Sequence, residues 1–232
     1  MSYVPDFTVV YMSTACEICG PLAWLNAAGV TLAYAVGTIV GGLIIGVICG
    51  VILLFPLYYG LPMLVYGYVQ FFRCTPLLVQ IVWFFYALPM VGNAVGLGIN
   101  MPAWMAAGLG LTLYMGAFSS EIFRAGIMSI DRGQWQAARA LGMTYLQLMR
   151  RIILPQASRR MVPPFVNQSV LQLKNTSLLY VVAVPDLMYT SSVMTAFTYR
   201  PLEVYTFVAL LYFLMLYPMT VFSKRLESRV DN

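Results

Sequence analysis

Two long stretches without any charged residue constrain this chain more than any other feature of its sequence. No Asp, Glu, Lys or Arg occurs between Glu17 and Arg73, and none occurs between Arg73 and Glu121. Each stretch is more than twice as long as the roughly 20 apolar residues that a helix needs to cross a bilayer. Hydrophobic residues make up 61% of the chain and charged residues only 9%, too apolar a composition for a water-soluble globule of this length. The sequence therefore predicts an all-α membrane protein.

Residue types that support catalysis or cofactor binding are scarce. The chain has no His, which excludes imidazole catalysis and His metal sites. Neither Lys174 nor Lys224 follows a GxxxxG pattern, so the chain lacks a phosphate-binding loop, and any ATP must be bound by a partner chain. Cys16 and Cys19 form a single CxxC, which is either an ordinary pair or a disulfide facing an oxidising space. We expect no metal and no cofactor.

Pro and Gly residues divide the uncharged stretches into separate spans. Pro56, Gly60 and Pro62 separate the first span from the second, and the turn-like segment 92–102 precedes the third. A charged block at residues 121–160 follows before the chain becomes apolar again. We predict a single transmembrane domain over residues 1–232, with five spans at about 26–54, 63–90, 103–128, 163–184 and 202–223.

The distribution of Lys and Arg predicts the orientation of these spans. The segment before Asn26 has no Lys or Arg, so it lacks the basic region of a signal peptide and is typical of a translocated tail. Arg200 is the one cation on the proposed outer side. The inner cations are Arg124, Arg132, Arg139, Arg150, Arg151, Arg159, Arg160, Lys224, Arg225 and Arg229. Because positive loops stay in the cytoplasm, we expect the N-terminus outside and the C-terminus inside the inner membrane. The net charge of +5 then reflects topology, without nucleic-acid binding.

Small residues punctuate the first predicted span. Gly37 and Gly41, and likewise Gly46 and Gly50, are four residues apart, which places each pair on one face of a helix. Such faces let two helices approach closely. The sequence leaves open whether the partner helix belongs to another subunit or to the same chain.

Residues 131–160 are the most informative segment outside the predicted spans. Asp131 is a typical first residue of a helix, and good helix formers follow it until Gly142 predicts a stop. Thr144 predicts the start of a second helix, which Pro155 is expected to end. We therefore expect two short, basic, amphipathic helices that meet at a glycine outside the bilayer.

These helices fit two roles. A basic amphipathic surface can lie on anionic lipid headgroups. Alternatively, Ala137 and Ala138 leave little side chain on the first helix, which suits close approach by another protein. Trp135, Leu141 and Met143 supply apolar anchors typical of interfaces. The paired alanines favour protein docking.

The segment QAARALGMTYLQLMRRIILP, residues 136–155, resembles the EAA loop of the membrane subunits of ATP-binding-cassette importers. That loop has EAA, three residues, Gly, nine residues and then I-x-L-P. Gln136 replaces the glutamate, so an ion pair that family members make there becomes at most a neutral hydrogen bond. The resemblance implies contact with an ATPase subunit through Gln136, Ala137, Ala138, Gly142, Leu154 and Pro155.

Three further segments are similar to the polar amino-acid branch of these importers, over roughly residues 26–226. They are YVQFFRCTPLLVQ at 68–80, EIFRAGI at 121–127 and LKNTSL at 173–178, with Cys74 where Gly is usual and Asn175 where Asp is frequent. The resemblance implies a type I importer permease with five spans and cytoplasmic coupling helices. It also implies a second permease subunit, identical or different, together with ATPase subunits and an extracytoplasmic substrate-binding protein. Residues 174–180 resemble glutamate/aspartate permeases.

Arg73 is the first candidate for binding a substrate, because a charge inside the bilayer is costly and needs a reason. It precedes Thr75 and Pro76, which predict a helix break with Thr75 as the N-cap. A guanidinium beside a helix N-terminus would suit a carboxylate. The alternative is a proline kink in which a partner helix satisfies Arg73.

Polar residues of the fourth predicted span share one helical face and could line a path for the substrate. Lys174 is on the other side and needs an anion such as Glu121 or Asp186, so structural pairing within the chain is favoured over substrate contact. Glu121 can also pair with Arg124. The complete set of candidate substrate-binding residues is Arg73, Thr75, Gln80, Glu121, Gln168, Gln172, Asn175 and Thr176.

Three classes of function are compatible with a membrane chain of this kind. The favoured one is a transport subunit that moves a polar amino acid and receives ATPase motion through the EAA loop. A stand-alone secondary transporter would need its own coupling-ion site and has no use for such a loop. A membrane enzyme is disfavoured because the sequence offers no nucleophile–base or metal constellation.

Overall fold

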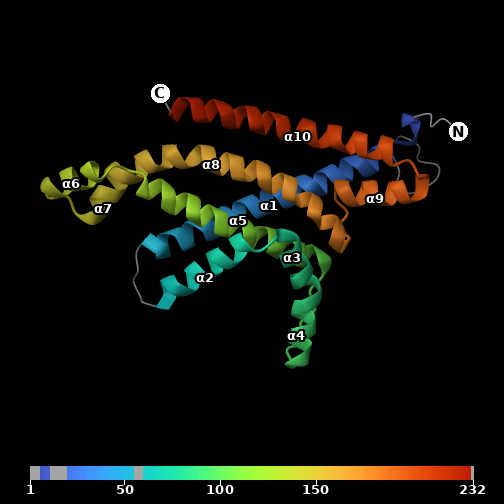
Figure 1. Ribbon diagram of the computed structural model, residues 1–232, viewed down its shortest axis with the longest axis horizontal. Helices are drawn as coiled ribbons and strands as arrows, with labels where there is room; N and C mark the ends of the chain where they lie inside the picture. The colour runs from blue at the N-terminus through green and yellow to red at the C-terminus, as the bar shows by residue number, and fades with distance from the viewer. Residues whose placement is uncertain (1–5, 11–19, 55–59, 231–232) are drawn as a thin grey trace.

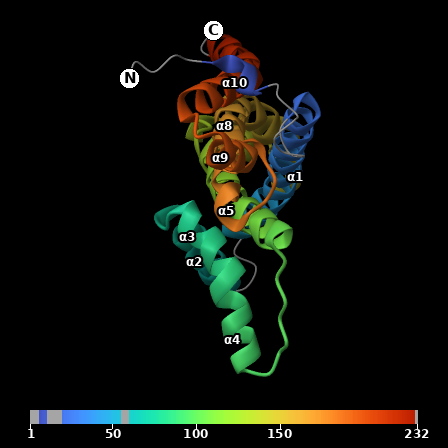
Figure 2. The ribbon, with the colours of Figure 1, turned by 90° about the vertical axis from the view of Figure 1, so that its right-hand side faces the viewer.

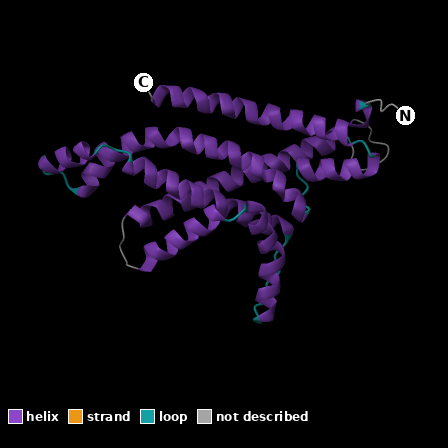
Figure 3. Cartoon of the chain, viewed as in Figure 1, coloured by secondary structure: helices purple, strands orange, loops and turns teal. Residues whose placement is uncertain are grey.

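The computed structural model describes residues 6–10, 20–54 and 60–230, and over these residues the chain is helical without strands (Figure 3). The helices are α1 (Pro21–Leu54), α2 (Gly60–Cys74), α3 (Leu77–Val82), α4 (Leu88–Ala94), α5 (Ala103–Met128), α6 (Arg132–Ala140), α7 (Tyr145–Leu148), α8 (Leu154–Asn175), α9 (Leu187–Thr198) and α10 (Pro201–Val230). Shorter 3-10 or π segments are η1 (Phe7–Val10), η2 (Trp83–Ala87), η3 (Met149–Ile153) and η4 (Thr176–Val182). The predicted all-α fold is confirmed for the described residues. The Cys16–Cys19 pair and Pro56 lie outside them.

Helix α5 is the centre of the bundle, with α1, α2, α3 and α8 all in contact with it (Figure 1). Its contact with α1 is the most extensive, because glycines of α1 let the two backbones approach closely. A Cβ atom at Gly42 or Gly46 would collide with α5, and one at Gly50 would lie 2.6 Å from Cδ1 of Phe123. The glycine face of the first span is therefore an intrachain contact over these positions, whereas Gly37 has nothing within 4 Å.

The second predicted span is not one straight helix. Helix α2 ends at Cys74 and α3 begins at Leu77, because Pro76 has no N–H and restricts the residue before it. Helices α3 and α4 then point away from the bundle, as both views show (Figures 1 and 2). Ile81 of α3 is fully buried in a cluster with residues of α5 and η4, which anchors the base of this arm.

Helix α8 carries the predicted fourth span and extends further toward the loop than expected. The prediction that Pro155 ends a helix is wrong, since Pro155 lies in the first turn of α8. Pro is tolerated there because the N–H groups of a first turn have no partner within their own helix. The π-helical segment η3 joins α7 directly to α8, so the second helix of the loop runs on into the bundle.

Length and composition identify three helical segments that are able to cross a membrane among the described residues, namely Pro21–Leu54, Leu77–Ala94 and Pro201–Leu226. A bent pair, Tyr145–Val182 with Leu187–Thr198, makes a fourth if it is counted as one span; its two parts meet at 46°. Five spans and the orientation of the termini stay predictions.

Candidate functional site

A cavity of about 570 Å³ opens between α2, α5 and α8. This volume falls within the range of roughly 300–1,000 Å³ that is typical of small-molecule sites. The cavity is lined by Arg73, Phe118, Glu121, Ile122, Arg160, Pro163, Pro164, Asn167, Gln168 and Leu171. Three of the predicted substrate-binding residues, Arg73, Glu121 and Gln168, therefore line the same cavity, each from a different helix.

Glu121 is held between two arginines. Arg124, one turn further along α5, donates from Nε to Oε2 at 3.1 Å and from Nη2 to Oε1, a bidentate arrangement. Arg73, in the last turn of α2, reaches the same carboxylate less closely, with 4.0 Å between Nη1 and Oε2. Its guanidinium carbon also lies 5.7 Å from the ring centre of Phe118. Because one carboxylate faces two guanidinium groups, the group formed by Arg73, Glu121 and Arg124 carries an excess positive charge.

The predicted site residues at the helix break, Thr75 and Gln80, do not line the cavity. The prediction that Thr75 caps α3 is wrong, because α3 starts without a side-chain cap. The Oγ1 atom of Thr75 instead donates back to the carbonyl of Phe71 at 2.7 Å. Gln80 is buried and donates from Nε2 to the carbonyl of Phe72 at 3.0 Å and to Thr75 Oγ1 at 2.6 Å. These bonds tie the two ends of the break together.

The polar face of α8 is divided between two environments. Gln172 is fully buried and donates from Nε2 to Thr38 Oγ1 at 3.0 Å and to the carbonyl of Leu111 at 2.9 Å, so it joins α8 to α1 and α5. Thr176 is also buried and bonds to its own helix. Gln168, one turn before Gln172, is 7% exposed, lines the cavity and has no hydrogen-bond partner for Nε2. The structure thus separates Gln168 from Gln172, Asn175 and Thr176.

The expected anion partner of Lys174 is not found among the described residues. Glu121 pairs with the two arginines, and Asp186 caps α9 by accepting from the Tyr189 N–H at 2.8 Å. Lys174 is exposed, and none of the ion pairs formed within the described ranges involves it.

Several cavity residues were not singled out from the sequence. Arg160, from α8, lines the cavity and donates from Nη1 to the carbonyl of Ser129. Pro163 and Pro164 stand in the interior of α8. A double proline within an apolar span is a visible signal, because proline removes a helical hydrogen bond. Their place at the cavity follows only from how α8 is rotated against α5.

The predicted pair of short helices forms a second site at one end of the molecule (Figure 1). Helix α6 ends in a Schellman motif: Gly142, at φ +70°, donates to the Arg139 carbonyl, and Met143 donates to the Ala138 carbonyl. Thr144 and Gln147 then form a complete capping box at the start of α7. The prediction of two helices that meet at a glycine is confirmed.

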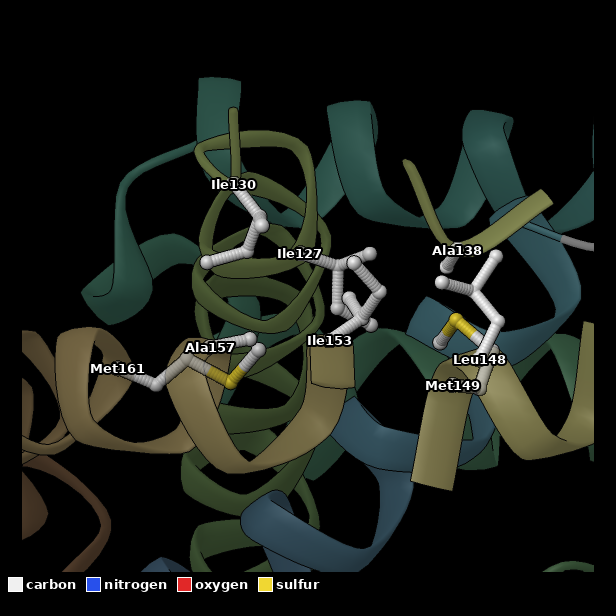
Figure 4. Close-up of a cluster of buried hydrophobic side chains, with 8 residues drawn as sticks. All are labelled: Ile127, Ile130, Ala138, Leu148, Met149, Ile153, Ala157 and Met161. Carbon is white, nitrogen blue, oxygen red and sulfur yellow. The ribbon is translucent and has the colours of Figure 1, made fainter. Parts of the chain in front are cut away.

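Buried side chains join this α6–α7 hairpin to the bundle (Figure 4). The cluster contains Ile127, Ile130, Ala138, Leu148, Met149, Ile153, Ala157 and Met161, from α5, the hairpin and α8. Ala138 is 1% exposed, so its small side chain serves this intrachain contact. The prediction that Ala138 suits the approach of another protein is therefore wrong. Gln136, Ala137 and Gly142 remain on the surface, beside Leu141 and Leu146, which are 79% and 76% exposed.

Known proteins resemble this chain over most of its length. Residues 42–232 match the family described as binding-protein-dependent transport system inner membrane component. A probable glutamine ABC transporter permease protein, GlnM of Bacillus subtilis strain 168, is 41% identical over 165 residues, which cover 71% of this chain and 74% of GlnM. The glutamate/aspartate import permease protein GltK of Escherichia coli O6:H1 is 39% identical over 151 residues, 64% of this chain and 67% of GltK.

A solved structure shares the fold. The crystal structure of an amino acid ABC transporter with histidines contains a chain that superposes with a TM-score of 0.81 at 29% identity. The match covers 89% of this chain and 93% of the other. The relatives found by sequence and the structure found by fold therefore belong to the same class of membrane protein.

Proposed function

The chain belongs to the family of binding-protein-dependent transport system inner membrane components, as a permease subunit of a polar amino-acid ABC importer, and from this premise we propose that the α2–α5–α8 cavity carries the substrate. As a member of this family it is a multi-pass protein of the inner membrane. We propose glutamate or aspartate as its substrate, with glutamine as the second candidate. The names of the relatives GltK and GlnM support these candidates.

One observation carries the assignment of the site: Arg73 presents a guanidinium to the cavity that Glu121 does not occupy fully. Arg124 already binds Glu121 in a bidentate manner, while Arg73 is 4.0 Å away and its side chain is 33% exposed. An arginine in this state can bind the α-carboxylate of an amino acid with two charge-assisted hydrogen bonds. We propose that Gln168, which lines the same cavity with an unpartnered Nε2, contacts the rest of the substrate.

The α6–α7 hairpin is proposed as the contact for an ATPase subunit. Its exposed residues Gln136, Ala137, Leu141 and Leu146 surround the Gly142 corner, and its inner face packs on α5 and α8. A push on the hairpin would therefore reach α5 and α8, two of the three helices that line the cavity. Two ATPase subunits, a second permease subunit and an extracytoplasmic substrate-binding protein complete the proposed importer.

Transport by the reconstituted importer tests the site. Arg73→Gln should lower uptake of labelled glutamate and glutamine at least about tenfold, since a lost charged contact of about 1.4 kcal/mol has that effect. Basal ATP hydrolysis and subunit assembly should persist. Lys224→Gln is the matched control, because it removes one exposed cation of α10 that does not line the cavity. Normal uptake by an assembled Arg73→Gln importer would place the carboxylate elsewhere, with Gln168 as the next candidate.

A further inference from the structure

Asp186 is a buried carboxylate that the proposed transport site does not use. It lies in the polar segment between the fourth and fifth predicted spans, as the N-cap of α9, and its exposed fraction is 0%. Its Oδ1 accepts from the N–H of Tyr189 at 2.8 Å, whereas Oδ2 has no hydrogen-bond partner. Asp186 does not line the α2–α5–α8 cavity, so substrate contact does not account for its burial.

No cation compensates the charge of this carboxylate within the part of the chain that the structure describes. The ion pairs found there involve Glu121 and Glu203, and none of them includes Asp186. An ionised carboxylate that is buried without a counter-charge is costly, and such a group commonly takes up a proton instead. Burial accordingly raises the pKa of Asp186 to about 6.

A second buried group without a regular hydrogen bond lies nearby. The ring of Tyr212, from α10, packs against the apolar cluster that contains Leu187, the residue after Asp186. The Tyr212 hydroxyl makes no hydrogen bond of ordinary geometry and is within electrostatic reach of the Asp186 carboxylate. A neutral carboxyl group has one O–H donor, and a phenol oxygen can accept from it. One proton on Asp186 would therefore pair the two groups.

The other elements around this carboxylate contribute neutral hydroxyl groups. Thr31 of α1 and Thr176 of η4 are fully buried beside the Tyr212 hydroxyl. The Thr31 Oγ1 accepts from the N–H of Leu187 at 3.2 Å, which ties α1 to the start of α9. Glu203, in the first turn of α10, is held in an ion pair of its own. Tyr212 is therefore the titratable side chain that these contacts place nearest to the carboxylate.

We propose that Asp186 takes up a proton in the folded chain and that its neutral carboxyl group donates to Tyr212, which fastens the start of α9 to α10. This joint follows the bend of 46° between the segment that ends at Val182 and α9. Loss of the proton leaves a buried charge at the joint. The end of the bundle that carries η1 and α9 is then tighter in mild acid than at neutral pH.

Infrared difference spectroscopy of the purified permease in nanodiscs measures this proton directly, through the C=O stretch of a neutral carboxyl group. The wild type should gain such a band as the pH falls through about 6. Asp186→Asn should lack this band. Glu203→Gln should retain it, because Glu203 is equally buried but already ion-paired. Absence of the band from the wild type overturns the proposal even if both variants fail to fold.

Tyr212→Phe tests the direction of the proposed hydrogen bond. The substitution keeps the ring but removes the acceptor of the carboxyl proton, so the midpoint of the infrared titration should fall to lower pH. A midpoint that rises overturns the proposal, because Tyr212 then donates to an ionised carboxylate. A band that Na+ suppresses at constant pH also overturns it, since a bound cation then neutralises Asp186 in place of a proton.

Thermal unfolding supplies an independent readout. The folded chain holds a proton on Asp186 at a pH where the unfolded chain has lost it, so acid favours the folded state. Between about pH 7.5 and about pH 5 the wild type should therefore gain about 2–4 °C in Tm relative to Asp186→Asn. The same dependence of Tm on pH in both proteins would contradict a proton bound at Asp186.

Discussion

Gln168 and Gln172 show at the residue scale how one helical turn separates a structural side chain from a cavity side chain. Both residues lie on the same face of α8 and both are largely buried. Gln172 donates its amide N–H groups to Thr38 and to Leu111, which lie on two other helices. Gln168 keeps an amide nitrogen without a partner beside the cavity. Burial alone does not distinguish the two roles, but hydrogen-bond partners do.

Leucine substitutions at these two positions should affect different properties, the stability at Gln172 and the binding of the amino acid at Gln168. Gln172→Leu leaves the carbonyl of Leu111 and the hydroxyl of Thr38 without their donor, which should cost about 1–3 kcal/mol of stability. Thermal unfolding of the purified permease in detergent measures this loss as a lower midpoint. Gln168→Leu should keep the midpoint and weaken amino-acid binding. A stable Gln172→Leu protein would show that these bonds add nothing to the bundle.

At the scale of elements, the close contact between α1 and α5 organises the bundle. The glycines of α1 that face α5 are spaced by one helical turn, and side chains of Met115, Ser119 and Phe123 occupy the space that a Cβ would need. Without bulk between them, the two helices can pack backbone against backbone. Helix α8 packs against both α5 and α1, and the cavity forms where α5 and α8 meet α2.

Valine scanning of α1 tests this contact. Gly46→Val forces new atoms against Ser119 and should destabilise the chain by about 1–3 kcal/mol, the usual cost of overpacking. Gly37→Val is the control, because nothing lies within 4 Å of the added Cβ. We expect its stability in detergent to change by less than about 0.5 kcal/mol. Equal effects of the two substitutions would contradict a glycine contact specific to α5.

The α6–α7 hairpin is the second element, and we propose a mechanical role for it. Its turn depends on the positive φ of Gly142, and its inner side is fixed to α5 and α8 by the cluster around Ile153. Because the hairpin and the cavity share these two helices, a docking partner at the hairpin can act on the cavity. Lipid headgroups alone would not require such a rigid connection.

Gly142→Asp should therefore abolish substrate-stimulated ATP hydrolysis and transport while leaving the chain inserted. The added carboxylate would enter a close protein contact and would have to be desolvated there. Gly98→Asp is matched for backbone strain, since Gly98 also has a positive φ, +58°, and has open space around it. Its coupling should stay near normal. Normal coupled activity of Gly142→Asp would give the hairpin another role.

At the scale of the whole molecule, the α6–α7 hairpin lies at one end of the bundle, and η1 and α9 lie together at the opposite end (Figure 1). The N-terminal residues are tied to their end by buried contacts: Trp24 donates from its indole to the carbonyl of Val10 at 3.1 Å, and Glu203 accepts from the Asp6 N–H at 3.0 Å. The arm of α3 and α4 leaves the bundle between these ends. We expect these two ends to lie on opposite sides of the membrane.

Cysteine labelling measures the orientation. In a Cys-free background, a cysteine at Ser158, at the start of α8, should react only with a reagent in the cytoplasm. A cysteine at Asn93, near the tip of α4, should react only from outside. Both positions are exposed, so both are accessible to the reagent. The reverse pattern would overturn the predicted topology, which rests on the excess of arginine in the inner loops.

The sequence alone determined the features that depend on neighbouring residues. Gly142, Thr144 with Gln147, and Pro76 act within one or two helical turns, so the corner, the capping box and the helix break all occur where the sequence predicts them. The apolar stretches determined the helical class in the same way, because lipid permits few other backbones. Pro155 is the local exception: proline is compatible with a first helical turn, and its position in a helix depends on what precedes it.

Tertiary structure decided everything that depends on how the helices are rotated against one another. Gln172 reaches partners 134 and 61 residues away, and Ala138 is buried in a cluster that also contains side chains of α5 and α8; neither could be deduced from helical spacing. The same rotation brings Arg73, Glu121, Gln168 and the proline pair to one cavity. Helical periodicity defines which residues share a face, but close packing of glycine-bearing and bulky faces selects the helix that each face meets.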